Sequence, residues 1–268
     1  LLMPGLVDCH VHFNEPGREA WEGATAGSAA AAAGGITTSL EMPFNALPVT
    51  NDVASLRVKR RAVRDKLLVD YGQWGLLEDD NLDALDGMHR EGVIGFKAFM
   101  CEPGPFGWVK AFGLHEGMER VGPWGNVIGV HAEDDSLIKG FTQKLRGAGR
   151  KDLRAWAASR PPVAELEAIK RAVLMAADTG AFLHVVHMTT PQGFETIRRA
   201  RSNGVRVTGE TCPHYLSLDE EDLLRLGAVA KCAPPLRSRD TVEGLWAIAL
   251  AGEVDVVSSD HCPCTPEM

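Results

Sequence analysis

The sequence predicts an α/β fold, a (β/α)₈ TIM-like barrel, because of two features that run along its whole length. Eight short apolar runs, each typical of a buried strand, alternate with segments that have the pattern of helices. Such alternation is typical of parallel βαβ units, and eight of these units close a barrel. The 268 residues, 45% of them hydrophobic, suffice for one large core. We therefore predict a single domain over residues 1–268.

The predicted strands and helices follow one another in order along the chain. Strands are expected at residues 6–12, 36–42, 68–77, 93–100, 127–131, 182–187, 205–211 and 254–259. Helices are expected at residues 21–33, which are rich in alanine, and at 53–67, 81–90, 163–178, 191–203 and 241–251. The helix at 163–178 has the clearest limits, because Pro161 and Pro162 favour a start and Gly180 favours a stop. The stretch 134–160 is the least regular, and we predict a long loop over the barrel mouth there.

The composition excludes several classes of protein. A formal net charge of −8 and only 6% aromatic residues give no basic face for nucleic acid. No run of about 18 apolar residues is present, as a membrane-spanning helix would need, and the start LLMPGLVD lacks the charged region of a signal peptide. Six cysteines without disulfide-like spacing indicate reduced thiols, so we expect a cytoplasmic protein.

Side chains that can bind a metal stand at the C-terminal ends of the apolar runs. They are His10, His12, Lys97, His131, His187 and Asp260. In a parallel barrel these strand ends meet at one mouth, so we expect the six side chains to form one cluster. Residues i and i+2 of a strand share a face, so His10 and His12 should project together. The same alternation predicts that His187 shares a face with Leu183 and Val185, whereas His184 points the other way.

These residue types favour a site for two metal ions. Imidazoles and carboxylates suit zinc and similar ions, and four histidines with one aspartate exceed the needs of one tetrahedral site. Lys97 has two explanations, which its spacing alone does not separate. Its ammonium would repel a dication, so it either pairs with a carboxylate or phosphate, or its neutral amine reacts with carbon dioxide. The carbamate formed in that reaction is an anion whose two oxygens can bridge two metal ions.

Because of these six candidate ligands, the chain resembles the binuclear-metal amidohydrolase superfamily, and the resemblance covers essentially its whole length. The shared pattern is His-x-His after the first strand, lysine after the fourth, histidine after the fifth and sixth, and aspartate after the eighth. Within the superfamily, several long segments look like allantoinases, which are related to hydantoinases and dihydroorotases. The segments are HVHFNEPGREAWEG at 10–23, EMPFNALPVT at 41–50, GFKAF at 95–99, ETCPHYL at 210–216, KCAPPLR at 231–237 and SSDHCPCTPE at 258–267.

The resemblance implies a function and a cofactor. The function is hydrolysis of the hydantoin ring of allantoin, a small molecule, to allantoate in purine catabolism. The cofactor is a pair of divalent metal ions, expected to be zinc, bridged by carboxylated Lys97. One ion would be held by His10, His12 and Asp260, and the other by His131 and His187.

The resemblance also carries expectations about the whole protein. Members of the family have a small β-sandwich, built from segments on both sides of the barrel. This chain shows neither those segments nor a helix after the eighth strand, so we expect a fragment truncated at both ends. The full-length protein is expected to be a homo-oligomer, a tetramer.

Three residues are candidate substrate contacts, and Asp260 is the candidate catalytic residue. Dihydroorotases place an arginine two residues after the second histidine, where it can grip a carboxylate. This chain has Asn14 there, and an amide can both donate to and accept from a neutral ureido group. Asn45 and the backbone near Thr211 are the other candidates, although either asparagine could instead cap a turn. Asp260 is expected to take a proton from the attacking water and pass it to the leaving nitrogen.

Two other functions stay open. The first is another cyclic amidase, either a hydantoinase (dihydropyrimidinase) or a dihydroorotase, although Asn14 and the segment NEPGR at 14–18 speak against both. The second is a non-catalytic, dihydropyrimidinase-like scaffold protein. Such a protein would be free to lose metal ligands, yet all six candidates are present.

Overall fold

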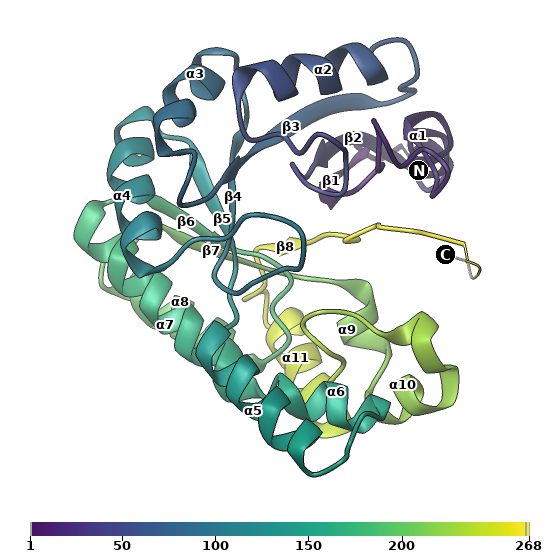
Figure 1. The fold of residues 1–268 in the computed structure, drawn as a ribbon, viewed down its shortest axis with the longest axis vertical. Coiled ribbons are helices and arrows are strands. Elements are labelled where there is room, and N and C mark those ends of the chain that lie inside the picture. The colour runs from purple at the N-terminus through teal and green to yellow at the C-terminus, as the bar shows by residue number, and fades with distance from the viewer. Residues whose placement is uncertain (1, 266, 268) are drawn as a thin grey trace.

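The computed structural model describes residues 2–265 and 267 and has the predicted (β/α)₈ architecture. Its strands form one parallel sheet in sequential order, as a barrel requires. They are β1 (Leu6–Val11), β2 (Ile36–Glu41), β3 (Asp70–Leu77), β4 (Gly95–Phe99), β5 (Val127–His131), β6 (Phe182–Val185), β7 (Val207–Thr211) and β8 (Val256–Val257). Each strand lies within a run predicted from the sequence (Figure 1).

The segment that follows β8 closes the barrel. β8 has only two residues, which pair with Glu210 and Thr211 of β7. Immediately after it, His261 forms a parallel bridge with Val11 of β1, and its carbonyl accepts from the backbone nitrogen of His12 at 2.7 Å. Oδ1 of Asp8 accepts from the backbone nitrogen of Ser259 at 3.2 Å. The last strand position is therefore joined to the first, which brings Asp260 beside the β1 histidines.

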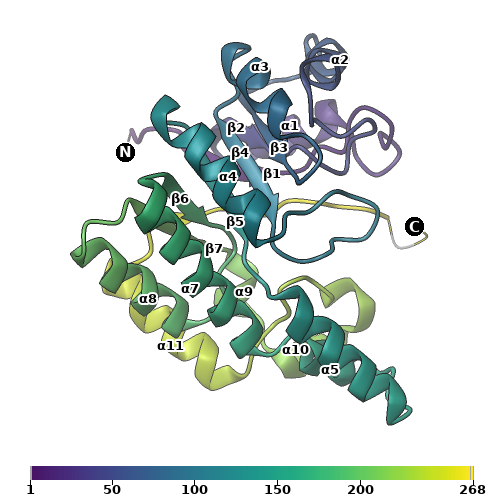
Figure 2. The ribbon, with the colours of Figure 1, turned by 60° about the vertical axis from the view of Figure 1, so that its left-hand side comes forward.

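The helices lie outside the ring of strands (Figures 1 and 2). They are α1 (Ala24–Ala33), α2 (Val53–Val63), α3 (Leu85–Arg90), α4 (Ala111–Val121), α5 (Asp135–Gly147), α6 (Leu153–Ser159), α7 (Pro162–Thr179), α8 (Pro191–Ser202), α9 (Pro213–Ser217), α10 (Glu220–Leu226) and α11 (Arg239–Leu250). Short 3₁₀ turns are η1 (Leu82–Ala84), η2 (Gly122–Trp124) and η3 (Gly227–Ala230). None of the described helices is long and apolar enough to cross a membrane.

The prediction of a long loop at 134–160 is wrong, because this stretch forms two helices, α5 and α6. Asp134 accepts from the backbone nitrogen of Leu137, and Asp152 accepts from that of Ala155, so each helix has an aspartate N-cap. α5 buries none of its residues, and Figure 2 shows it at the periphery of the molecule. The apolar residues of α5 nevertheless have helical spacing, so the sequence contained a signal for this helix that the loop prediction missed: Leu137, Ile138, Phe141 and Leu145.

Side chains of the strands alternate between two apolar layers. The outer layer lies between the strands and the helices and includes Phe96 and Val130, whereas the inner layer fills the barrel and includes Leu76 and Val186. The indole of Trp74 also lies in the inner layer. A Cβ atom at Gly95 would come within 2.8 Å of this indole, so the glycine makes room for it. The inner layer supports the polar residues at the mouth from below.

Candidate metal centre at the barrel mouth

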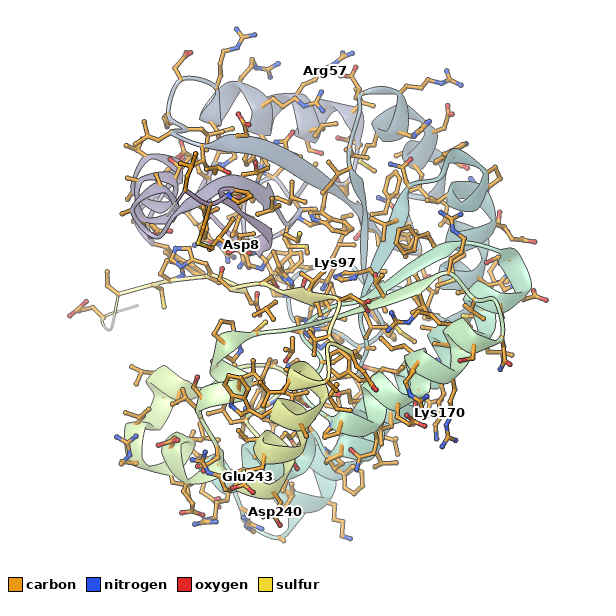
Figure 3. All side chains as sticks on the ribbon, turned by 180° about the vertical axis from the view of Figure 1, so that it is seen from behind. Asp8, Arg57, Lys97, Lys170, Asp240 and Glu243 are labelled. Atoms are coloured by element: carbon orange, nitrogen blue, oxygen red, sulfur yellow. The ribbon has the colours of Figure 1, made fainter. Side chains whose placement is uncertain are left out.

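The structure brings the six predicted ligands together inside the barrel mouth. His10 and His12 lie on β1 and just after it, His131 ends β5, His187 follows β6 and Asp260 follows β8. The imidazole centroids of His10 and His12 are 5.4 Å apart, those of His10 and His187 5.5 Å, and those of His131 and His187 4.6 Å. Lys97 projects from β4 into the interior of the barrel (Figure 3).

One half of the cluster consists of His10, His12 and Asp260. Oδ1 of Asp260 lies 3.2 Å from Nε2 of His10 and 3.3 Å from Nε2 of His12. Burial alone would raise the pKa of Asp260, but the charge of His10 and the hydrogen bond with His12 outweigh burial and lower this pKa. The carboxylate is therefore ionised at neutral pH, and the three side chains have a suitable geometry for one metal ion.

The other half consists of His131 and His187, and here one predicted orientation is wrong. Nδ1 of His131 lies 3.1 Å from Nε2 of His187. Leu183 and Val185, with which His187 was expected to share a face, point into the outer layer. β6 ends at Val185, and His187 has a φ of 39°, in the left-handed region. This local turn interrupts the alternation and directs the imidazole inward.

His184 also points inward, contrary to the prediction that it faces away from the site. Its Nε2 lies 3.2 Å from Oε2 of Glu210. Glu210 in turn has Oε1 2.9 Å from Nδ1 of His10. His184 is thus linked to the cluster through a carboxylate that the sequence analysis did not select.

The environment of Lys97 shifts this side chain toward the neutral amine. Its side chain is fully buried, and Nζ has no hydrogen-bond partner among the described residues. Nζ lies 5.3 Å from the ring centroid of Phe99 and 6.0 Å from that of Phe44. Burial lowers the pKa of Lys97 to about 8, although the charges of Asp260 and Glu210 oppose this shift. The geometry gives no support to a direct ion pair of Lys97 with a carboxylate.

Two buried glutamates at the site escaped the sequence analysis. Glu210 lies on β7, and Glu133 follows His131 by two residues. The sequence contains a signal for each of these glutamates. Glu210 is a charged residue within a predicted buried strand, and Glu133 follows the candidate ligand His131 by two residues, as His12 follows His10. Burial of a charge without a partner is unfavourable, so such positions suggest a polar network.

A cavity of about 360 Å³ opens above the cluster. The rings of Phe44, Phe99 and Phe106 form an apolar part of its wall. Four of the cluster's histidines and Asp260 line it as well, and Arg160 is its one lysine or arginine within the described residues. The cavity thus combines a polar floor with aromatic sides, a combination that is typical of small-molecule sites.

The three predicted substrate contacts have different positions. Asn45 lines the cavity, and its Nδ2 lies 2.9 Å from Sγ of Cys262. Asn14 is fully buried and donates to the carbonyl of Pro263 at 3.3 Å. Thr211 is also fully buried, and its hydroxyl donates to the carbonyl of Met188 at 2.8 Å. Only Asn45 presents its side chain where a ligand in this cavity could reach it.

Two further histidines, His214 and His261, lie at the edge of the site. Nε2 of His261 contacts Oε2 of Glu22 at 2.7 Å. His214 lines a neighbouring cavity of about 450 Å³, which it shares with His12 and Asp260. Neither imidazole is part of the described groups that could hold a metal ion.

The residues of the cluster fit divalent metal ions. Four imidazoles and one carboxylate are donors that zinc and similar ions accept. The 3.1 Å approach of Nδ1 of His131 to Nε2 of His187 places two ring nitrogens where one ion could bind both. The buried Nζ of Lys97 and Nδ1 of His187 have no hydrogen-bond partner among the described residues.

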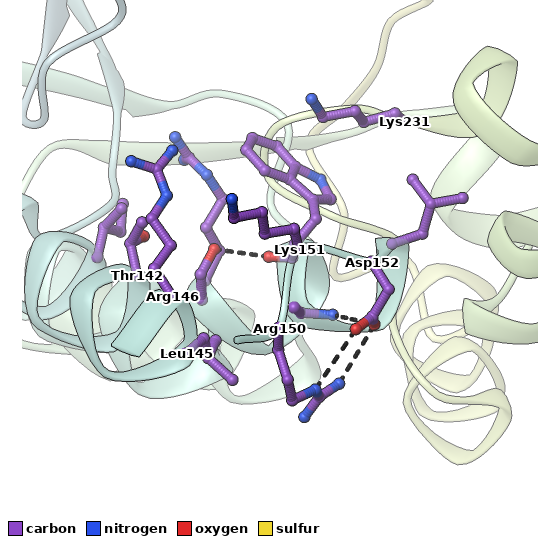
Figure 4. A pocket seen from close by; sticks show the side chains of 13 residues that line it. Thr142, Leu145, Arg146, Arg150, Lys151, Asp152 and Lys231 are labelled. Carbon is purple, nitrogen blue, oxygen red and sulfur yellow. Dashed lines mark hydrogen bonds and ion pairs between the residues drawn. The ribbon is translucent and has the colours of Figure 1, made fainter. Parts of the chain in front are cut away.

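A second cavity, of about 710 Å³, lies beside the first and is drawn in Figure 4. It is bounded by α5, α6 and Lys231. Five cationic side chains line it: Arg146, Arg150, Lys151, Arg160 and Lys231. Four of these are exposed, and only Arg160, together with Trp156, also lines the cavity above the cluster. The two cavities therefore share one wall.

The fold and the cluster define a class of protein: a (β/α)₈ barrel with a candidate metal centre at the C-terminal ends of its strands. A family described as dihydro-orotase-like matches residues 1–192. The chain belongs to this dihydro-orotase-like family. This agrees with the resemblance to amidohydrolases found in the sequence.

Proteins named allantoinase are similar to the chain over its whole length. Identity is 46% over 270 residues with the allantoinase of Rubrobacter xylanophilus and 46% over 269 residues with that of Solibacter usitatus. It is 40% over 274 residues with that of Escherichia coli strain HS. Each alignment covers 100% of this chain, but only 59–60% of the relative.

Solved structures of hydantoinases have the same fold. The L-hydantoinase (dihydropyrimidinase) from Arthrobacter aurescens superposes with a TM-score of 0.95 at 36% identity, covering 99% of this chain and 59% of that one. The dihydropyrimidinase from Brevibacillus agri superposes with a TM-score of 0.88 at 30% identity, covering 98% and 59%. The chain thus spans about 60% of the length of these proteins.

Proposed function

We propose that this protein hydrolyses the hydantoin ring of allantoin to give allantoate, as a metal-dependent cyclic amide hydrolase. The observation that carries the proposal is the convergence of four histidines and Asp260 on one cavity, with Lys97 fully buried beside this cluster. The similarity to proteins named allantoinase, at 40–46% identity, supports allantoin as the substrate. A scaffold protein without catalysis would have no need of this cluster.

We propose two divalent metal ions, expected to be zinc, as the cofactor. His10, His12 and Asp260 would hold one, and His131 and His187 the other. The unpartnered, buried Nζ of Lys97 supports carboxylation of this residue: the neutral amine adds carbon dioxide, a proton leaves, and a carbamate remains. When bound, the ions would supply Lewis-acid activation of a water molecule and of the ring carbonyl.

The chain's own residues would position the substrate and move the proton. The ionised carboxylate of Asp260 can accept a proton from the attacking water and deliver it to the ring nitrogen that leaves. The rings of Phe44 and Phe99 can pack against the planar hydantoin, and Asn45 can hydrogen-bond to its amide groups. Asn14 and Thr211 stay candidate substrate contacts, although their burial favours an indirect role through the backbone that they hold.

The test is metal analysis and a substrate panel on the full-length protein. We expect about two zinc ions per chain and turnover of allantoin, with little turnover of dihydroorotate, because no arginine stands at position 14. Efficient hydrolysis of dihydroorotate would overturn allantoin as the proposed substrate, but it would leave the assignment as a cyclic amide hydrolase intact. A folded protein that binds no metal and hydrolyses none of these substrates would overturn both.

A hydantoinase is the second candidate, and it is favoured by the TM-score of 0.95 with the L-hydantoinase. The same panel separates the two, because hydantoin lacks the ureido group that allantoin carries. A higher kcat/KM for substituted hydantoins or dihydrouracil than for allantoin would select this candidate. The substrate panel is the deciding test, because small changes in pocket contacts set substrate preference.

We also propose a cytoplasmic location and a homotetramer for the full-length protein. All six cysteines are free thiols, which suits a reducing compartment. Light scattering coupled to gel filtration would test the assembly, and a dimer or monomer at micromolar concentration would contradict it.

A further inference from the structure

Each half of the cluster contains one histidine whose second ring nitrogen faces a buried carboxylate. Nε2 of His131 lies 2.7 Å from Oε2 of Glu133, and Nδ1 of His10 lies 2.9 Å from Oε1 of Glu210. Neither carboxylate has any exposed side-chain surface. An ionised carboxylate only accepts hydrogen bonds, so the nitrogen that faces it carries the proton. Nδ1 of His131 then keeps its lone pair, and so does Nε2 of His10 once a metal ion lies between this atom and the carboxylate of Asp260.

The nitrogens left with lone pairs are those that face the cluster. Nδ1 of His131 is the atom that approaches His187 at 3.1 Å, and Nε2 of His10 is the atom that approaches Asp260 at 3.2 Å. The opposite tautomer of either ring would direct an N–H group toward the position of a metal ion. The two glutamates therefore favour the form of each ring that can coordinate.

Both carboxylates are themselves held in place by other groups. Arg160 pairs with Oε2 of Glu133, and its guanidinium lies 4.8 Å from the ring centroid of Trp156. Oε1 of Glu210 accepts from the backbone nitrogen of His187 at 3.1 Å, and Oε2 lies 3.2 Å from Nε2 of His184. Neither carboxylate can rotate without losing a charged or hydrogen-bonded partner in a buried setting, which is costly.

Glu133 has one competing explanation, as a metal ligand. Cys101, His131 and Glu133 lie close enough together to hold an ion. However, the guanidinium of Arg160 already contacts Glu133, and its positive charge would repel a dication at that point. The geometry thus favours a supporting role for Glu133.

We propose that Glu133 and Glu210 are positioning residues that set the tautomer and orientation of His131 and His10, and that Arg160 holds Glu133 for this purpose. The inference rests on the proposed metal centre. It assigns one orienting carboxylate to each half, so that loss of either glutamate should weaken one metal position more than the other. Partners of this kind typically contribute about 10–100-fold to metal affinity or activity.

The experiment measures zinc in the full-length protein and its release to a chelator. Wild type should release two ions slowly. Glu133→Ala should release one of them about 10–100-fold faster, and Glu133→Gln should be intermediate, because the amide oxygen still accepts from Nε2. Glu210→Ala should instead accelerate release of the other ion, and Arg160→Lys should act in the same direction as Glu133→Gln.

A matched control is Asp178→Asn. Asp178 contacts Nε2 of His115 at 2.7 Å on the outside of the molecule, so it is a carboxylate–histidine pair remote from the cluster. This variant should release zinc as wild type does. Cys101→Ala should also retain two ions, and loss of one ion from it would mean that the Cys101 group itself binds metal, which overturns the assignment of Glu133.

A second readout covers the case in which an alanine variant folds poorly. Nitrogen-15 NMR of histidine-labelled, metal-free protein should show His131 with its proton on Nε2 in wild type and mixed tautomers in Glu133→Leu. Zinc release from Glu133→Gln and Glu133→Ala at the wild-type rate, with unchanged tautomers, would overturn the inference. A wild type that binds no zinc would instead overturn the proposed metal centre, so the two failures are distinguishable.

Discussion

At the scale of single residues, Lys97 shows how burial changes what a side chain can do. Its Nζ has no hydrogen-bond partner among the described residues, and burial lowers its pKa to about 8. The neutral amine is the form that adds carbon dioxide. We predict that Lys97→Ala lowers allantoin hydrolysis by more than the roughly 100-fold expected for loss of an orienting partner, because it removes the proposed bridge between the ions.

The measurement is activity with and without added short carboxylic acids such as acetate or propionate. These acids should restore part of the activity of Lys97→Ala by supplying two oxygens in the vacated space. The matched control is Lys59→Ala, because Lys59 is equally buried but paired with Glu41 at 2.8 Å. Acids should not help that variant, and wild-type activity in Lys97→Ala would contradict the carbamate.

The two asparagines give a second prediction at this scale. Asn45 and Asn14 have φ angles of 70° and 62°, so glycine is a substitution that either backbone tolerates. Asn45 lines the cavity, and Asn45→Gly should lower kcat/KM for allantoin by up to about tenfold, the value of one hydrogen bond. Asn14→Gly should instead lower stability, because Asn14 is buried and bonded to Pro263. Steady-state kinetics and urea unfolding check both variants. A loss of kcat/KM in Asn14→Gly, with a loss of stability in Asn45→Gly, would show that Asn14 is the substrate contact.

At the scale of elements, the helix caps explain both a success and a failure of the sequence analysis. The start of α2 was predicted correctly, and there Asp52 and Ser55 form a reciprocal capping box. Asp134 and Asp152 also cap α5 and α6, each by accepting one backbone hydrogen bond without a reciprocal partner, yet the stretch 134–160 was expected to be a loop. The two helices differ in packing, since α2 buries four residues whereas α5 buries none, but the helical spacing of Leu137, Phe141 and Leu145 would have identified α5 as well.

The cap of α2 gives a prediction about stability and pH. Hydrogen bonds from the backbone and side chain of Ser55 lower the pKa of Asp52 from 3.8. A carboxyl group whose pKa is lower in the folded protein than in the unfolded chain stabilises the fold at pH values above its unfolded-state pKa. This stabilisation is lost as the pH falls through the pKa that the group has in the folded protein. Asp52→Ala should therefore cost about 1 kcal/mol at pH 7 and progressively less below pH 3.8. Urea unfolding checks this, with Asp65→Ala, an exposed change just after the same helix, as a neutral control.

At the scale of the whole molecule, apolar side chains remain exposed along the strands that meet at the seam of the barrel. Leu6 and Val7 of β1 are 57% and 53% exposed, and Val257 of β8 is 50% exposed. Exposed apolar patches favour association. We predict that the 268-residue chain, expressed by itself, forms soluble aggregates that the double variant Val7→Thr/Val257→Thr reduces. Leu174→Thr, which changes an even more exposed residue (71%) on α7, should have less effect by light scattering, and a monodisperse wild-type chain would contradict the prediction.

The sequence by itself determined the eight strands, most of the helices and the cluster of candidate ligands. The strands could be predicted because each is an apolar run of limited length, and parallel strands carry their C-terminal ends to one mouth. Once this is known, the approach of Asp260 to His10 and His12 follows from the order of strands around the ring. Local pattern and topology were sufficient here.

Only the tertiary structure decided how several side chains are oriented and held. His187 faces the cluster because its backbone leaves the strand conformation at a φ of 39°, which no alternation of residues reveals. The contacts of Glu210 with His10 and of Glu133 with His131 and Arg160 join residues from different elements. Such contacts depend on the register and closure of the barrel, and these are set by packing of the whole chain and not by any local stretch of sequence.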